Sequence, residues 1–211
     1  MSYVMSVSPD FPPAQIAEWY ILNTWLQRQL DTQIHLELYG SFEAQRKAVA
    51  ADQIDLIYAN PFDAAMLVRE KGFTAIAKPQ NTADEVIIAV SVDSPIEDVS
   101  ELADGIRIAK TDDPDVNMIG MIMLEPADLS GGNTHSEIVD TYALVAKQLM
   151  KGDADVGFFL AESYALFSDF LKKQLKVLVN SQISVICHAF MVSPAAAEHA
   201  DAIQALLLDM R

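Results

Sequence analysis

The stretch "DQIDLIYANPFDAAMLVREKG", residues 52–72, decides the fold. Its first half holds a short apolar run at 54–59, which predicts a buried strand. Asn-Pro-Phe then opens a segment from Pro61 to Lys71 that predicts a helix, since proline is favoured at the first helical position. A buried strand that leads directly into a helix is typical of a parallel sheet covered by helices.

The same alternation continues on both sides of this stretch. Upstream we expect strands at 3–7 and 34–39 and helices at 13–30 and 41–51, and downstream a strand at 73–78. A long apolar strand at 85–92 can then leave this first lobe. A second set follows, with strands at 106–110, 136–140, 154–159 and 176–180 and helices after Pro114, over 141–151 and from Glu162.

The last elements return the chain to the first lobe. They are a predicted strand at 185–192 and a helix at 194–210. The sequence therefore predicts an α/β protein of two lobes, 1–84 plus 183–211 and an inserted 85–182. The hinge is expected near 85–92 and 176–182, with any ligand in the cleft between the lobes.

Composition narrows the classes of function. The formal charge is −16, from 30 acidic and 14 basic residues, and such a surface repels nucleic-acid backbones and anionic lipid heads. A single cysteine, Cys187, rules out an intrachain disulfide. No segment reaches transmembrane length. We expect neither nucleic acid nor direct membrane insertion. The compartment stays open: periplasmic if a signal peptide was removed, cytoplasmic if the chain is complete.

The order of several motifs resembles the solute-binding proteins of phosphonate and phosphite uptake systems, a branch of the type II periplasmic binding proteins. The opening stretch carries this resemblance, together with "VDSPIEDVSELADGIRIA", "KGDADVGFF" and "NSQISVICHAFMVSP". It implies two α/β lobes with mixed, mostly parallel sheets that close as a clamp over a small molecule. It also implies a membrane permease as partner, or a sensor protein.

The resemblance further implies which positions meet the ligand. In that family a Ser-Thr-Ser run after an Asp-Pro dipeptide holds the phosphonate oxygens, whereas Val116-Asn117-Met118 follows here. Other family positions fall on residues of a different type. The ligand-binding candidates are Ser8, Phe42, Tyr58, Asn60, Asp84, Thr111, Asp113, Asn117, Tyr142 and Ser181. Most oxyanion-binding groups are replaced, so we expect a ligand other than phosphonate.

The acids in "AKTDDPDVNMIGM", residues 109–121, have two interpretations. Asp112 or Asp113 before Pro114 can cap a helix. Alternatively one of them, with Asp84 or Glu162, faces the cleft and favours an amine-bearing or neutral polar ligand.

The aromatic and polar candidate residues also have structural interpretations that involve no ligand. Tyr58 and Phe42 either stack on a ligand or pack in the core. Asn60 and Ser181 either bind a ligand or form turns.

The sequence gives little support for a metal site or a catalytic site. The four histidines, His35, His135, His188 and His199, have no metal-ligand spacing, and we expect no metal and no cofactor. Cys187 and His188 would point to opposite faces of a strand. We therefore expect a non-enzymatic solute-binding protein. Two alternatives remain: a cytoplasmic enzyme on the same fold, similar to menaquinone-pathway proteins, and a sensing or interaction domain without a transport role.

Overall fold

The computed structural model describes residues 2–11, 15–80 and 83–210 of the 211. The chain divides into two compact units: Met1–Thr82 with Cys187–Arg211, and Ala83–Ile186. We call them unit 1 and unit 2. The chain thus passes between the units within a few residues of the boundaries that the sequence predicted. That these connecting segments act as a hinge stays a prediction. The expected helix start at Pro13 lies outside the described residues.

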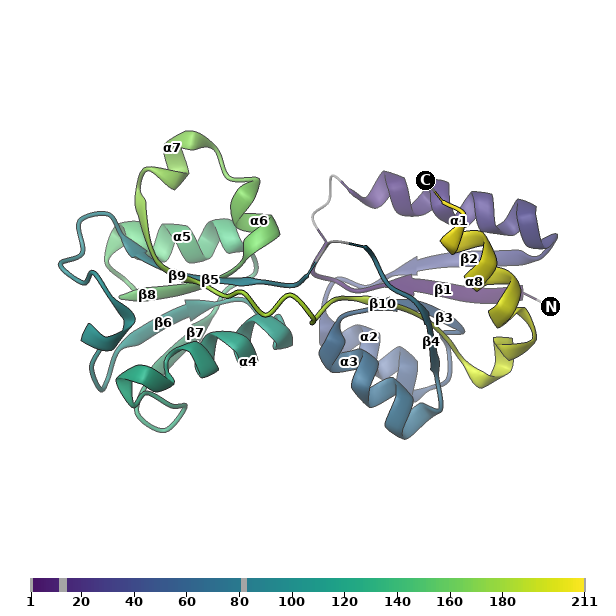
Figure 1. The fold of residues 1–211 in the computed structure, drawn as a ribbon, viewed down its shortest axis with the longest axis horizontal. Helices are drawn as coiled ribbons and strands as arrows, with labels where there is room; N and C mark the ends of the chain where they lie inside the picture. Colours follow the sequence, from purple (N-terminus) through teal and green to yellow (C-terminus); the bar gives the residue numbers. More distant parts are fainter. Residues whose placement is uncertain (1, 12–14, 81–82, 211) are drawn as a thin grey trace. The chain divides into compact units, whose positions relative to one another are not determined.

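Unit 1 is a five-stranded sheet in the order β2-β1-β3-β10-β4. β1 (Ser2–Val7) is parallel to β2 (Gln33–Leu38) and β3 (Leu56–Ala59), and β10 (Ala189–Val192) is antiparallel to β3 and β4 (Thr74–Ala77). Helices α1 (Ile16–Leu30) and α8 (Ala200–Leu208) cover one face (Figure 1). α2 (Phe42–Ala50) and α3 (Pro61–Met66) cover the other.

The alternating direction of the side chains along β3 explains how both faces of the unit 1 sheet are packed. Successive strand side chains point to opposite sides. Leu56 and Tyr58 therefore pack toward α1 and α8, while Ile57 and Ala59 pack toward α2 and α3. A π-helical turn at Leu67–Lys71 extends α3 and ends at Gly72, whose φ of 69° suits a residue without a side chain.

Unit 2 repeats the plan with the strand order β7-β6-β8-β5-β9. β6 (Arg107–Lys110) is parallel to β7 (His135–Ile138) and β8 (Val156–Leu160), and β5 (Val86–Ser91) is antiparallel to β8 and β9 (Leu175–Asn180). α4 (Pro114–Met123) covers one face of this sheet. α5 (Tyr142–Lys151), α6 (Ala161–Ala165) and α7 (Asp169–Lys172) lie on the other (Figure 1).

Gly120 sets how closely α4 approaches the sheet of unit 2. A Cβ at this position would lie 2.6 Å from the ring of Phe158, a fully buried residue of β8. Any side chain there would push the helix away, because contacts this short do not occur in packed interiors. The glycine therefore fixes the position of α4 and of the loop at its start.

Three predicted elements differ from the structure. The helix expected at 194–210 is a 3-10 helix at Pro194–His199 followed by α8. The helix expected from Glu162 is two short helices, because Ser168 caps a new one by accepting a hydrogen bond from the Leu171 amide. The strand expected at 185–192 begins only at Ala189. Residues 185–188 span the crossing from unit 2 to unit 1, where the chain leaves one sheet before it joins the other.

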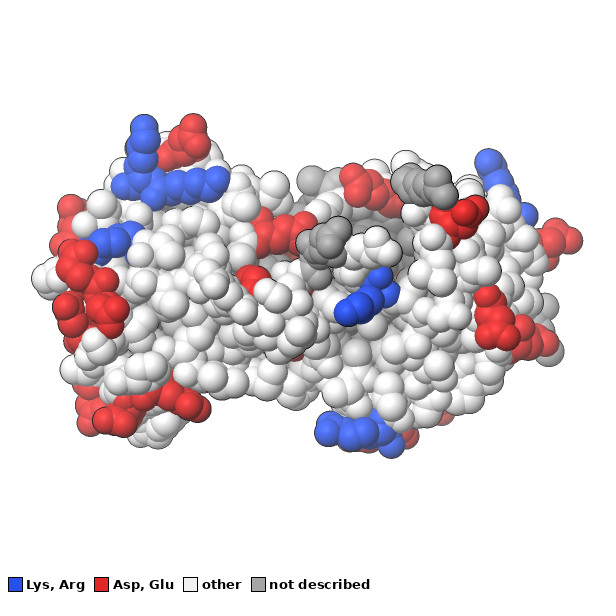
Figure 2. Space-filling model, in the orientation of Figure 1, with Lys and Arg blue, Asp and Glu red and all other residues white. Residues whose placement is uncertain are grey.

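Short 3-10 helices occur at Val99–Glu101 and Glu125–Ala127 in unit 2 and at Pro194–His199 before α8. The net charge of −16 appears as acidic groups over both units, and the basic side chains on the face shown in Figure 2 form small separate groups.

Candidate functional site

The loop from β6 to α4 holds the first group of candidate residues. Asp113 is the N-cap of α4, and its Oδ1 accepts hydrogen bonds from the amides of Asp115 at 3.1 Å and Val116 at 3.2 Å. The side chain is almost fully buried, with 3% of the residue exposed. Its neighbour Asp112 is exposed. Of the two predicted capping acids, Asp113 therefore caps the helix.

The second carboxylate oxygen of Asp113 joins this loop to α5. Tyr142 is the first residue of α5, and its hydroxyl donates to Asp113 Oδ2 at 2.8 Å. Asn117 Nδ2 donates to the Thr111 carbonyl at 2.9 Å, and the Asp113 amide donates to Thr111 Oγ1 at 3.4 Å. The structure thus brings together Thr111, Asp113, Asn117 and Tyr142, four residues singled out from the sequence.

Two polar groups in or next to this cluster have no partner among its other members. The buried Oδ1 atom of Asn117 accepts no hydrogen bond from any described residue. Lys110, the only base close in sequence, is half-buried at the end of β6, and burial lowers the pKa of its ammonium. Among the described residues it forms no ion pair, so it does not offset the negative charge of the neighbouring acids by direct contact.

Ser181 and Asp84 lie instead where the chain enters and leaves unit 2. Ser181 Oγ accepts from the Val86 amide at 2.8 Å and donates to a carboxylate oxygen of Glu85. Glu85 also accepts from the amides of Ile183 at 3.0 Å and Ser184 at 2.7 Å. Ser181 therefore fastens two segments of unit 2 to each other, which is the structural alternative to ligand binding. Asp84 is buried beside them.

Glu85 was not predicted from the sequence, yet it organises this pair of segments. Burial raises the pKa of Glu85, but the hydrogen bonds from Ser181, Ser184 and Ile183 outweigh burial, so the pKa lies below its ordinary value of 4.5. A folded-state pKa below the unfolded one stabilises the protein above pH 4.5, and this stabilisation is lost as the pH falls through the folded value.

We therefore expect Glu85→Gln to lower the free energy of unfolding at pH 7 by about 1–2 kcal/mol, because a charged acceptor of several hydrogen bonds is lost. The gap between variant and wild type should narrow as the pH falls below 4.5. Urea denaturation across this pH range measures it. Glu125→Gln, at an exposed position of the same unit, is the control and should follow the wild-type pH profile. Equal pH profiles for Glu85→Gln and wild type would contradict the assignment.

In unit 1 a series of hydrogen bonds connects Ser8, Asn60 and Asp63. Asn60 caps α3 by accepting from the Asp63 amide at 2.8 Å, and its Nδ2 donates to Asp63 Oδ2 at 2.9 Å and to Ser8 Oγ at 3.4 Å. Ser8 and Asn60 are both buried. Two of the predicted residues are thus in direct contact, at the ends of neighbouring parallel strands.

Arg46 extends this series of hydrogen bonds and holds Phe42. Its guanidinium forms a two-pronged pair with Asp63, Nε to Oδ1 at 2.6 Å and Nη2 to Oδ2 at 3.2 Å. It also lies over the rings of Phe42 and Phe62, at 5.6 and 5.4 Å from their centroids. Phe42 is 3% exposed. Its ring packs against the Arg46 guanidinium, which agrees with the interpretation of Phe42 as a core residue.

Arg46 and Asp63 were also missed by the sequence analysis. The available signal was the four-residue spacing of Phe42 and Arg46, which places both on one side of a helix.

Tyr58 packs on the sheet face covered by α1 and α8, whereas Phe42 belongs to α2 on the other face. It stacks on His188, with ring centroids 5.3 Å apart, and packs against Trp19 at 5.0 Å and Phe11 at 5.6 Å. His188 Nε2 contacts Asp10 Oδ2 at 2.9 Å. The histidine therefore pairs with a carboxylate rather than with Cys187. The prediction that 187 and 188 lie within a strand was wrong, since β10 begins after them.

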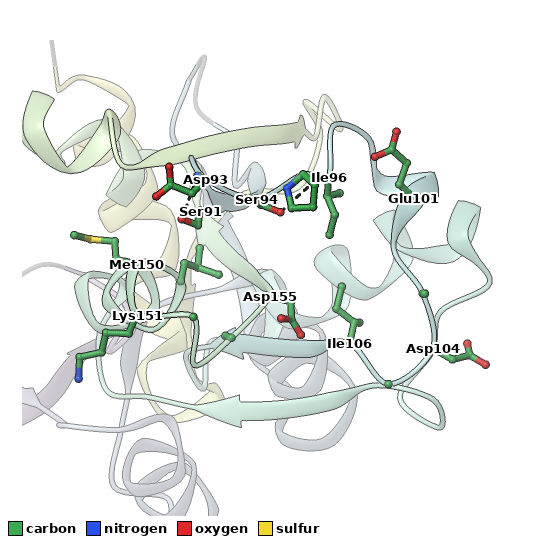
Figure 3. Close-up of a pocket in the computed structure, with 16 residues that line it drawn as sticks. Ser91, Asp93, Ser94, Ile96, Glu101, Asp104, Ile106, Met150, Lys151 and Asp155 are labelled. Atoms are coloured by element: carbon green, nitrogen blue, oxygen red, sulfur yellow. Dashed lines mark hydrogen bonds between the residues drawn. The ribbon is translucent and has the colours of Figure 1, made fainter.

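A cavity of about 680 Å³ lies elsewhere in unit 2 (Figure 3). Its lining includes Gly105 and Ile106 before β6 and Asp155 before β8, so it lies at the amino-terminal ends of these parallel strands. Asp113 follows the carboxyl-terminal end of β6. None of the predicted site residues lines this cavity. Among the described residues, no cluster of histidine, cysteine and acidic side chains could hold a metal ion.

Comparison with known proteins places the chain in a family. A sequence profile of the family described as "ABC transporter, phosphonate, periplasmic substrate-binding protein" matches residues 5–211. The chain belongs to this family. The match covers both units and confirms the resemblance seen in the order of motifs. Sequence comparison with characterised proteins gives no significant match. Within the described residues, no helix is both long and apolar enough to cross a membrane.

Solved structures confirm the fold of this substrate-binding family. PhnD1 from Prochlorococcus marinus, in complex with methylphosphonate, has a TM-score of 0.78 at 9% identity, covering 97% of this chain and 81% of that one. The aliphatic sulphonate binding protein SsuA from Escherichia coli gives 0.73 at 16% identity, with 98% and 70% covered. A binding component of an ABC phosphonate transporter from Pseudomonas aeruginosa gives 0.70 at 13% identity, with 97% and 72% covered. The two mixed sheets are those of a type II periplasmic binding protein.

Proposed function

We propose that this member of the family binds a small solute other than a phosphonate, without chemical turnover, and delivers it to a membrane permease. Family membership supports the binding role and the permease. The proposal about the ligand rests on one observation, which is that Asp113 Oδ1 accepts the amide hydrogen bonds of Asp115 and Val116.

These two amides belong to the first turn of α4, where a helix offers unpaired N–H groups and a partial positive charge to an anion. Here the protein's own carboxylate takes both of them. A phosphonate would have to displace Asp113 and then remain beside it. Two like charges 4 Å apart repel by about 4 kcal/mol at an effective dielectric constant near 20, which offsets much of the gain of about 3–6 kcal/mol from two amide hydrogen bonds to an anion.

The side chains at the start of α4, which include several carboxylates, support a different ligand. Asp112 is exposed, and Asp115 is buried next to the Asp113 cap. The positions after Pro114 hold no hydroxyl, because Val116, Asn117 and Met118 stand there. An amine-bearing or neutral polar solute complements the buried carboxylates of Asp113 and Asp115 and the amide of Asn117.

Isothermal titration calorimetry tests this proposal. We expect methylphosphonate, 2-aminoethylphosphonate and methanesulfonate to bind the wild type no more tightly than millimolar. In a thermal-shift screen of ethanolamine, putrescine and glycine betaine, we expect at least one compound to raise the melting temperature.

Two variants sharpen the test. Asp113→Ser keeps a capping side chain but removes the carboxylate, and it should weaken amine binding and strengthen methylphosphonate binding by about tenfold or more. Asp112→Ser is the matched control and should change neither by more than about threefold. Micromolar affinity of the wild type for methylphosphonate would overturn the proposal about the ligand. Failure of every compound to bind would overturn the binding role and favour a sensing or interaction domain.

A further inference from the structure

A second cavity, of about 520 Å³, lies within unit 1. Its floor is the sheet face that carries Tyr58 of β3, Phe190 of β10 and Ala77 of β4. Trp19 and Leu22 of α1 contribute to its walls. Its volume falls in the range of small-molecule sites. It shares none of its lining with the Asp113 cluster, which belongs to unit 2.

The other lining residues come from α8 and the segment after it. Leu207, Leu208 and Met210 line the cavity, and Leu208 and Met210 remain 67% and 52% exposed. Large apolar side chains left this open at the edge of an aromatic cavity gain from contact with an apolar molecule. Trp19 and Tyr58, with ring centroids 5.0 Å apart, offer two ring surfaces to it.

One charged side chain defines the polar end of the cavity. Among the described residues that line it, Lys78 alone carries a charge. Lys78 is exposed, and it takes no part in the ion pairs found among the described residues. In a chain with a net charge of −16, this position offers a positive group at the mouth of an apolar cavity, which complements an anionic head joined to an apolar body.

We propose that this cavity of unit 1 is a binding site for an amphipathic carboxylate. Its aliphatic or aromatic body lies against Trp19, Tyr58 and Phe190, and its carboxylate meets the ammonium of Lys78. The site is separate from the solute site proposed for unit 2, and neither depends on the other.

Tryptophan fluorescence tests the proposal directly. The chain has two tryptophans, so Trp25→Phe leaves Trp19 as the only reporter. Titrating this variant with decanoate below its micellar concentration should change the Trp19 emission in a saturable way. Decanol, which has the same chain without the charge, should bind at least about tenfold more weakly.

Matched variants locate the site, each made in the Trp25→Phe background. Leu208→Arg narrows the cavity and should weaken the binding of uncharged decanol, which the added guanidinium does not attract, about tenfold or more, whereas Ile21→Arg, on α1 outside the cavity and similarly exposed at 69%, should not. Lys78→Glu should weaken decanoate binding but not decanol binding. Arg28→Glu is the charge-matched control on an exposed position of unit 1. Circular dichroism verifies that each variant is folded.

Several results would overturn the proposal. They are the absence of a saturable change with decanoate, equal affinities for decanoate and decanol, and equal effects of Leu208→Arg and Ile21→Arg. Sedimentation that shows a dimer abolished by Leu208→Arg would assign the surface to a second copy of the chain instead. Asp113→Ser should leave decanoate binding unchanged, so failure here and failure of the proposed solute site are distinguished.

Discussion

Replacing Arg46 by methionine should lower the free energy of unfolding by about 3 kcal/mol, because it leaves the buried carboxylate of Asp63 without its cation. The Asp63 side chain is 5% exposed and that of Arg46 is 34% exposed. Methionine keeps the unbranched stem and the helix propensity, so the change isolates the charge. The expected loss lies at the lower end for broken buried pairs, since Asn60 Nδ2 still donates to Asp63.

The adjacent residue supplies the control. Lys47 pairs with Glu43 at 2.5 Å, but both side chains are at least 75% exposed. Lys47→Met should therefore cost less than about 0.5 kcal/mol. The double variant Arg46→Met with Asp63→Asn should recover part of the loss, because no buried charge is left unpaired. Urea denaturation measures all three, and equal losses for Arg46→Met and Lys47→Met would show that the Arg46 pair contributes no more than a surface pair.

Replacing Asp113 by alanine should destabilise unit 2 by about 2–3 kcal/mol. Loss of an N-cap costs about 1 kcal/mol, and the Tyr142 hydroxyl loses a charged acceptor, which costs a similar amount or more. Asp113→Asn keeps the cap and should cost about 1 kcal/mol. Hydrogen exchange gives a local measurement, because the amides of Asp115 and Val116 should exchange faster in Asp113→Ala.

Asp112→Ala is the matched control for this second prediction. Asp112 carries the same charge one residue earlier but is exposed and does not cap α4. We expect a change within about 0.5 kcal/mol. If Asp112→Ala and Asp113→Ala lose equal stability, the effect arises from the net charge of the loop and not from the cap.

The contacts among candidate residues of unit 2 were easier to predict from the sequence than those of unit 1. Thr111, Asp113 and Asn117 lie within one strand-to-helix loop, so their contacts follow from local geometry that the Asp-Pro signal reveals. Tyr142 was placed by family resemblance, and its contact with Asp113 depends on how α5 packs. Ser181 was predicted as a ligand group, but its hydroxyl bonds to Glu85, 96 residues earlier in the chain.

Arg46 and Glu85 were not predicted because their partners are distant in sequence. Arg46 on α2 reads as an ordinary exposed helical residue until α3 brings Asp63 and Phe62 beside it. Glu85 reads as the polar start of a strand until the returning segment offers the amides of Ile183 and Ser184. Burial and pairing of a charge depend on neighbours from other elements, which local patterns do not encode.

The sequence by itself determined the α/β alternation, the strand-to-helix turn at Asn60-Pro61, the family, and the cap before Pro114. These follow from periodicity and turn chemistry over a few residues. Only the tertiary structure decided the two faces of β3, which separate Tyr58 from Ala59. It also decided the pairing of Asp113 with Tyr142 and the apolar cavity between α1 and α8. The physical reason is that side-chain contacts across a sheet are made by elements far apart in the chain, after packing has fixed their register.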